Sequence, residues 1–169
     1  YNLQGQVFVL PGATLTIQPG TVIASDNGGS LAITRGARIN AVGTQQDPII
    51  FTSKQDVATW TAGNPKTGTW RAACNEWGAL TLMGAAYISE NAVATNTAAP
   101  NAGNYVNMEG LTASGSGDTR TFYGGGNDLD NSGSLRYTSL RYGGKVVGLG
   151  NELNGLSLGG IGKDTDIDH

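Results

Sequence analysis

Closely spaced side-chain oxygens occur in one short stretch of the chain, residues 127–131. Asp128, Asp130 and Asn131 together offer the carboxylate and amide oxygens that Ca²⁺ prefers, and this ion takes about six to eight oxygen ligands. The stretch does not match an EF-hand loop, since neither the glycine nor the closing glutamate is in the required place. It predicts either a calcium site or a turn in which these side chains cap the local backbone.

A second set of carboxylates, Asp164, Asp166 and Asp168, alternates with other residues near the end of the sequence. On a strand, this alternation places all three on one face. Glycoside hydrolysis needs two carboxylates in different protonation states, but the sequence offers them no partner set, and its single histidine is His169. The pattern is typical of a solvated strand face, so we identify no catalytic residue and do not expect an enzyme.

Two of the three tryptophans, Trp60 and Trp70, stand in a long polar stretch. An exposed indole beside amide groups can stack on a sugar ring, whereas a buried one covers the flank of a core. Trp60 and Trp70 are therefore expected either to pack against the flank of the coil or to contact a glycan.

Composition excludes several classes of partner. The net charge is −3 and no basic stripe is present, so nucleic acid is not expected to bind. No apolar run approaches the roughly 20 residues of a membrane-spanning helix. Cys74 is the only cysteine, which excludes a disulfide within the chain. No motif for a cofactor is found, and Ca²⁺ is the one ion considered.

Internal repetition is the strongest signal for the fold. The segments TLTIQPGTVI (14–23) and SLAITRGARI (30–39) share their apolar, glycine and isoleucine positions. Weaker copies follow, and a solenoid turn of roughly 20 residues is expected from them. One interior column is predicted to contain the leucines of these copies, namely Leu15, Leu31, Leu80, Leu135 and Leu156.

The repeat predicts an all-β fold, a parallel β-helix. Strands this short bury their alternating apolar side chains only by stacking like on like, and Gly20 and Gly36 permit the bends between them. A sandwich or barrel would need hairpin turns, and the single Asn-Gly pair lies inside a repeat. We expect one domain over 1–169, interrupted by two long loop insertions at about 53–77 and 89–129.

These motifs also resemble a known family. VLPGATLTIQPGTVI with GTQQDPIIFTS, then WGALTLMGAAYI, then DLDNSGSLRYTSLRYGG and NELNGLSLGGIGKDTDIDH are similar to turns of bacterial secreted and cell-surface β-helix proteins of the pectin-lyase-like superfamily. The resemblance implies a right-handed β-helix on an exported protein, secreted or held at the cell surface. It also implies that the chain is the N-terminal part of a longer solenoid, or a shortened one.

The expected function is that of a non-catalytic extracellular surface module for adhesion, display or glycan binding. The alternative is a self-assembling structural subunit of an extracellular filament or sheath, in which copies bind end to end. A polysaccharide-active β-helix enzyme is the second alternative. The residues expected at the assembling ends are Val7, Val9, Leu156, Leu158 and Ile167.

Overall fold

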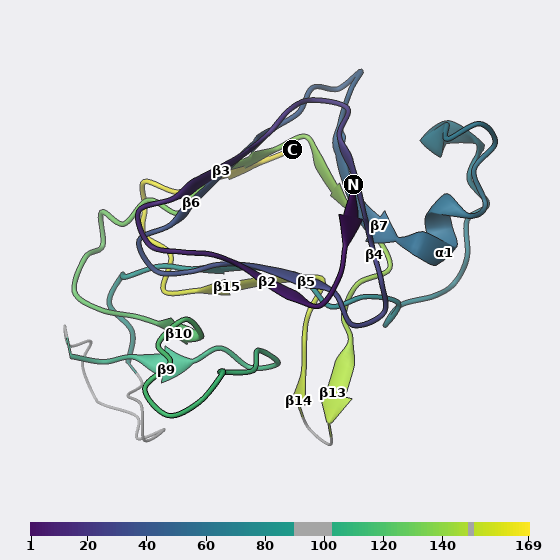
Figure 1. Ribbon diagram of the computed structural model, residues 1–169. Coiled ribbons are helices and arrows are strands. Elements are labelled where there is room, and N and C mark those ends of the chain that lie inside the picture. The colour runs from purple at the N-terminus through teal and green to yellow at the C-terminus, as the bar shows by residue number, and fades with distance from the viewer. Residues whose placement is uncertain (90–102, 149–150) are drawn as a thin grey trace.

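The polypeptide winds into a coil of short strands whose three sides enclose a triangular interior (Figure 1). The computed structural model describes residues 1–89, 103–148 and 151–169. Its strands are β1 (Asn2–Leu3), β2 (Gln6–Val9), β3 (Thr14–Ile17), β4 (Val22–Ser25), β5 (Ser30–Ile33), β6 (Arg38–Val42), β7 (Ile49–Ser53), β8 (Leu80–Met83), β9 (Val106–Asn107), β10 (Phe122–Tyr123), β11 (Gly133–Arg136), β12 (Thr138–Leu140), β13 (Val146–Gly148), β14 (Asn151–Glu152), β15 (Leu156–Gly159) and β16 (Asp166–Asp168). Two short helices follow β7, α1 (Lys54–Val57) and the 3₁₀ helix η1 (Pro65–Thr67).

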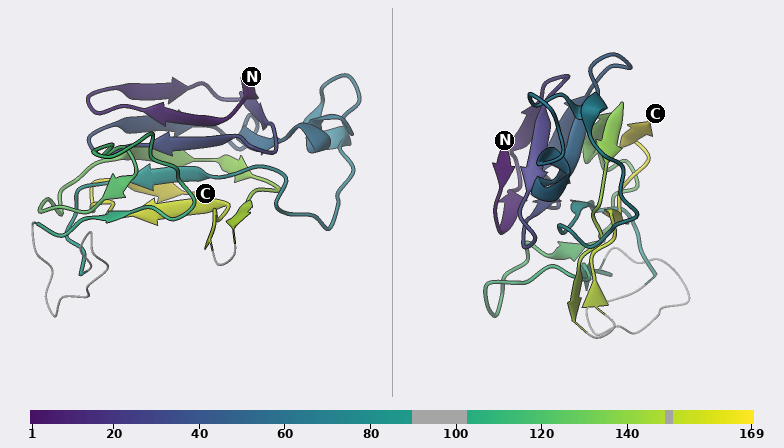
Figure 2. Two further views of the ribbon diagram at one scale, coloured as in Figure 1. Left: turned by 60° about the horizontal axis from the view of Figure 1, so that its bottom comes forward. Right: turned by 90° about the vertical axis from the view of Figure 1, so that its right-hand side faces the viewer.

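Three parallel sheets of four strands form the sides of the coil. Sheet A contains β1, β4, β7 and β12; sheet B contains β2, β5, β8 and β15; sheet C contains β3, β6, β11 and β16. The chain visits A, B and C in that order in every turn, so each strand pairs in parallel with its counterpart in the next turn. Figure 2 shows these turns stacked as layers. The predicted all-β parallel β-helix is confirmed.

The length of one turn differs from the expected value of roughly 20 residues. Val7 pairs with Leu31 and Leu15 pairs with Ile39, so these partners are 24 positions apart (7 to 31 and 15 to 39). The similar segments 14–23 and 30–39 are offset by 16 positions, and the strands with which they begin, β3 and β5, lie in sheets C and B. The offset of 16 positions therefore corresponds to two sides of the triangle, because each side takes about eight residues and has a similar sequence pattern.

The predicted column of five leucines is wrong for this reason. Leu31, Leu80 and Leu156 do stack on one another in sheet B. Leu15 and Leu135 lie instead in sheet C, where Leu15 pairs with Ile39 and Leu135 pairs with Ala41. All five still face the same interior, which is closed by side chains from all three sheets.

The glycine corners are confirmed. Gly20 and Gly36 have φ angles of 75° and 76°, in the left-handed region where a side chain is costly. Each follows a strand of sheet C or sheet B and turns the chain into the next side.

Trp77 belongs to the interior, although the sequence placed it at the end of a loop. It is 1% exposed and its ring stacks on Phe51 with 6.4 Å between the ring centroids. Its indole N–H donates to the main-chain oxygen of Arg141 at 2.6 Å. The expected loop over 53–77 also overlaps β7, which includes Ser53.

The two longest connections leave the coil after β7 and after β8. The first carries α1 and η1 and projects from the edge of sheet A (Figure 1). The second includes the β9–β10 pair. Met108, which directly follows β9, and Tyr123 of β10 pack with Phe8, Ala32 and Met83 on the outer side of sheet B. The range 89–129 expected for the second loop lies partly outside the described residues.

Candidate functional site

A group of linked side chains fastens the first connection to sheet A. Ser53 ends β7 and caps α1, since its hydroxyl accepts the N–H of Asp56 at 3.0 Å. The buried carboxylate of Asp56 then accepts the hydroxyl of Thr52 at 2.7 Å and the indole N–H of Trp60 at 3.2 Å. Trp60 also packs against Gly68, where an added Cβ would lie 2.8 Å from the indole. Trp60 is therefore held within the connection itself.

Glu76 provides the second attachment. Both its carboxylate oxygens accept N–H groups of Arg71, one of them at 2.8 Å, and the hydroxyl of Ser53 donates to the same carboxylate. The hydrogen bonds from Arg71 lower the pKa of Glu76, and they raise the pKa of Arg71. The Arg71 guanidinium lies over the ring of Tyr142, 4.6 Å from its centroid. The connection is thus joined to β7 and to the segment after β12.

Tyr142 occupies an unusual backbone conformation for a residue with a side chain. Its φ angle is 59°, in the left-handed region, which costs about 1–2 kcal/mol for a non-glycine residue. Its main-chain oxygen accepts the N–H of Glu76 at 3.0 Å, and its hydroxyl accepts the N–H of Arg71 at 3.4 Å. Strain held in place by neighbours in this way is concentrated at binding sites.

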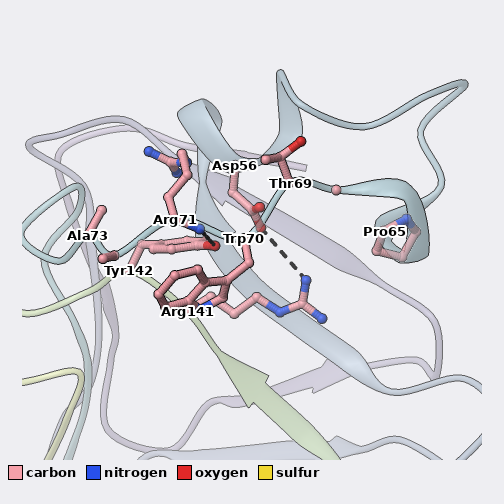
Figure 3. A pocket seen from close by; sticks show the side chains of 10 residues that line it. Asp56, Pro65, Thr69, Trp70, Arg71, Ala73, Arg141 and Tyr142 are labelled. Carbon is pink, nitrogen blue, oxygen red and sulfur yellow. Dashed lines mark hydrogen bonds and ion pairs between the residues drawn. The ribbon is translucent and has the colours of Figure 1, made fainter.

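A surface pocket with a volume of about 470 Å³, which we call the aromatic pocket, lies between the first connection and the segment after β12 (Figure 3). Its principal groups are the indole of Trp70, the phenol of Tyr142, the guanidinium groups of Arg71 and Arg141, and the carboxylate of Asp56. Trp70 is 80% exposed, so its ring faces solvent. Small-molecule sites combine apolar walls with a few polar groups in this manner.

The structure separates the two tryptophans that the sequence grouped together. Trp70 lines the aromatic pocket, whereas Trp60 does not and instead supports Asp56 from within the connection. The sequence did not identify the partners of Trp70 in this pocket, which are Tyr142, Arg71 and Arg141. The LRY motif occurs twice, at 135–137 and 140–142, and the second copy is the one signal that could have suggested them.

The residues considered for calcium take part in turns. Asp128 accepts the N–H of Tyr87 at 3.1 Å, and Asn131 accepts the N–H of Gly133 at 2.8 Å. Asp130 is 8% exposed and accepts the hydroxyl of Ser132 at 3.1 Å. Within the described ranges, no group of three or more His, Cys, Asp or Glu side chains is arranged to hold a metal ion. Calcium binding here stays a prediction.

A charged group on the outer side of sheet C was also missed. Arg136 of β11 lies 3.7 Å from Asp166 and 2.9 Å from Asp168 of β16. The parallel pairing of β11 with β16 brings these side chains together. Sequence spacing does not show it, because the residues are about 30 positions apart.

The residues expected at the assembling ends lie in the first and last turns. Val7, Leu158 and Ile167 are 41%, 45% and 43% exposed. Val9 and Leu156 are half-buried and pack against the core.

Comparisons with known proteins give one result. A family model described as a pectate-lyase-like beta helix domain matches residues 1–169. No curated protein and no solved structure shows significant similarity to the chain. In the described part of the chain, every helix is too short or too polar to cross a bilayer.

Proposed function

Because the chain belongs to the pectate-lyase-like β-helix family, which accounts for its fold and leaves its ligand open, we propose that it is a non-catalytic extracellular surface module that binds glycans. Adhesion and display are the roles that such binding serves. The aromatic pocket, on the first of the two expected insertions, is the binding site. Location outside the cell is part of the same proposal.

The observation that supports the proposal is the exposure of Trp70 beside ordered polar groups. An indole that is 80% exposed contributes little to folding, yet its neighbours Arg71 and Tyr142 are fixed by hydrogen bonds and ion pairs. A flat apolar ring surrounded by positioned donors and acceptors suits a pyranose, which has apolar C–H faces and a polar rim.

Replacement of Trp70 tests the proposal. Trp70→Ala should weaken binding to a glycan found on an oligosaccharide array by at least about tenfold, or about 1.4 kcal/mol, without changing the melting temperature. Tyr87→Ala is the matched control, because Tyr87 is an aromatic residue that is 42% exposed and lies outside the pocket. Equal binding by the wild type and Trp70→Ala would contradict the proposal.

Self-assembly is the second candidate function, favoured by the apolar surface of the first turn. Leu3, Leu15, Ile17 and Ile23 line a hollow of about 630 Å³ there. Strands at a sheet edge have unpaired N–H and C=O groups, which can pair with another copy or with a further turn. A filament or sheath subunit would use this surface.

A polysaccharide-active enzyme is the third candidate. It would need a basic residue beside carboxylates on one sheet face, and Arg136 beside Asp166 and Asp168 is such a group. Loss of chain length in a polysaccharide incubated with the protein, absent with Arg136→Ala, would support this candidate.

A further inference from the structure

We propose that the aromatic pocket selects a neutral sugar, and that Asp56 and Arg141 together recognise two neighbouring hydroxyl groups of one pyranose ring. The inference rests on the proposed glycan binding and specifies the class of ligand. The juxtaposition of Trp70, Asp56 and Arg141 in Figure 3 is the basis for it.

The balance of charge around the pocket argues against an acidic sugar. Two guanidinium groups, Arg71 and Arg141, line the pocket, and each has a carboxylate partner. Arg71 forms a two-armed ion pair with Glu76, and Arg141 lies 3.8 Å from Asp56. The four charges cancel, so the pocket has no excess positive charge to attract a uronate. An acidic ring would also approach the Asp56 carboxylate at a cost in repulsion.

Asp56 retains capacity to accept further hydrogen bonds. An ionised carboxylate has about four acceptor positions, and two donors from the described residues, Thr52 and Trp60, occupy part of them. The carboxylate is buried yet forms part of the pocket lining. A sugar hydroxyl that donates to Asp56 would occupy a third position.

Arg141 supplies the complementary donor. Its Nε donates to the hydroxyl of Ser139 at 3.0 Å. The 3.8 Å separation between its Nη1 and the Asp56 carboxylate is longer than a hydrogen bond. Among the described residues, the terminal N–H groups of Arg141 therefore donate to no acceptor at hydrogen-bonding distance.

A vicinal diol fits this arrangement of one acceptor and one donor. One hydroxyl donates to Asp56, the neighbouring hydroxyl accepts from Arg141, and the C–H face of the same ring rests on Trp70. The phenol of Tyr142, which accepts from the main chain of Arg71, keeps its own proton for a third hydroxyl. Neutral hexoses and pentoses in pyranose form offer this combination.

The test compares two tetrasaccharides of equal length, cellotetraose and tetragalacturonate, by isothermal titration calorimetry with the full chain. We expect cellotetraose to bind at least about tenfold more tightly. Its affinity should also be unchanged between low and high NaCl, because screening acts on charged ligands. Trp70→Ala should weaken binding of either sugar by at least about tenfold.

Arg141→Met tests the donor role, since methionine keeps much of the apolar stem without N–H groups. It should weaken cellotetraose binding by at least about tenfold while leaving the melting temperature close to that of the wild type. Lys66→Ala removes an exposed cation from the same connection outside the pocket lining and should leave affinity unchanged.

The outcomes separate the two proposals. Tighter binding of tetragalacturonate, lost in Trp70→Ala, would overturn the neutral-sugar inference and leave glycan binding in place. Unchanged cellotetraose affinity in a folded Arg141→Met variant would also overturn the inference. Binding of neither tetrasaccharide, together with no hit on the array, would overturn both proposals.

Discussion

Glu76 controls how firmly the aromatic pocket is attached to the coil. Arg71 and Ser53 donate to its ionised carboxylate, and Arg71 in turn stacks on Tyr142. Because these hydrogen bonds favour the charged form, the pKa of Glu76 lies below its ordinary value of 4.5. The stabilisation is therefore fully present above that ordinary value, and is lost as the pH falls through the lower pKa of the folded protein.

We expect the connection after β7 to loosen in acid before the coil unfolds. Protection factors at residues 54–79, which correct hydrogen exchange for its slower intrinsic rate in acid, should fall as the pH is lowered from 5 to 3, while those in β5 do not. Glu76→Gln should show the loosened state at pH 7, with a loss of about 2 kcal/mol of local stability. Acid-insensitive protection of residues 54–79 would count against this role.

Calcium binding is tested by chelation. If Asp128, Asp130 and Asn131 bind Ca²⁺, EDTA lowers the melting temperature of the wild type and has no effect on Asp130→Ala. The Ser132 contact makes Asp130→Ala destabilising in either case, so the response to EDTA is the informative measurement. If EDTA does not change the melting temperature of the wild type, the calcium hypothesis is wrong.

At the scale of single residues, the sequence predicted only part of the candidate site. Trp70 lines the aromatic pocket, and its contact with a glycan stays a prediction. Trp60 carried the same signal, and its hydrogen bond to Asp56 depends on the α1 turn, which sequence spacing does not show. The Arg136 group required the register between β11 and β16, which is set by the whole coil.

At the level of elements, a substitution in sheet B measures how much the interior contributes to the free energy of unfolding. Leu31 is 4% exposed and stacks between Val7 and Leu80. Leu31→Ala should lower the free energy of unfolding by about 2–5 kcal/mol, as large-to-small core substitutions do, measured by denaturant titration. Leu129→Ala is the control, since Leu129 is 57% exposed and should change the stability by less than about 1 kcal/mol.

The strands themselves were predictable, but their assignment to sheets was not. Alternation identified β3 and β5 correctly, because Ile17 and Ile33 are buried and the glycines after them turn the chain. The same pattern recurs on every side of the triangle, so similarity between segments could not distinguish one side from the next. Leu15 and Leu135 were placed in the wrong sheet for that reason alone.

At the scale of the whole molecule, the apolar ends predict association. Ile167 in β16 is 43% exposed and Leu158 in β15 is 45% exposed, and the first turn has the apolar hollow beside Leu15. In the chain as given, we expect end-to-end oligomers at high concentration. Ile167→Lys should reduce them, because a buried unpaired charge is costly, while the inner turns stay folded.

Sedimentation velocity over a range of concentrations measures this association, and electron microscopy shows whether the products are filaments. Lys163→Ala serves as the control, since Lys163 is an exposed residue of the same turn. A wild type that sediments as a monomer at every concentration would dismiss the assembly hypothesis.

The equivalence of the three sides has a consequence for how this chain tolerates deletions. Gln6 and Val7 pair with Ser30 and Leu31, so excision of residues 6–29 removes one complete period and returns every later strand to its own sheet. Excision of 16 residues, the spacing most visible in the sequence, would rotate each later strand by two sides instead. The connection after β7 would then leave from a different side, carrying Trp70 with it. Only the deletion of a whole period is therefore expected to leave the assignment of every later strand to its sheet unchanged.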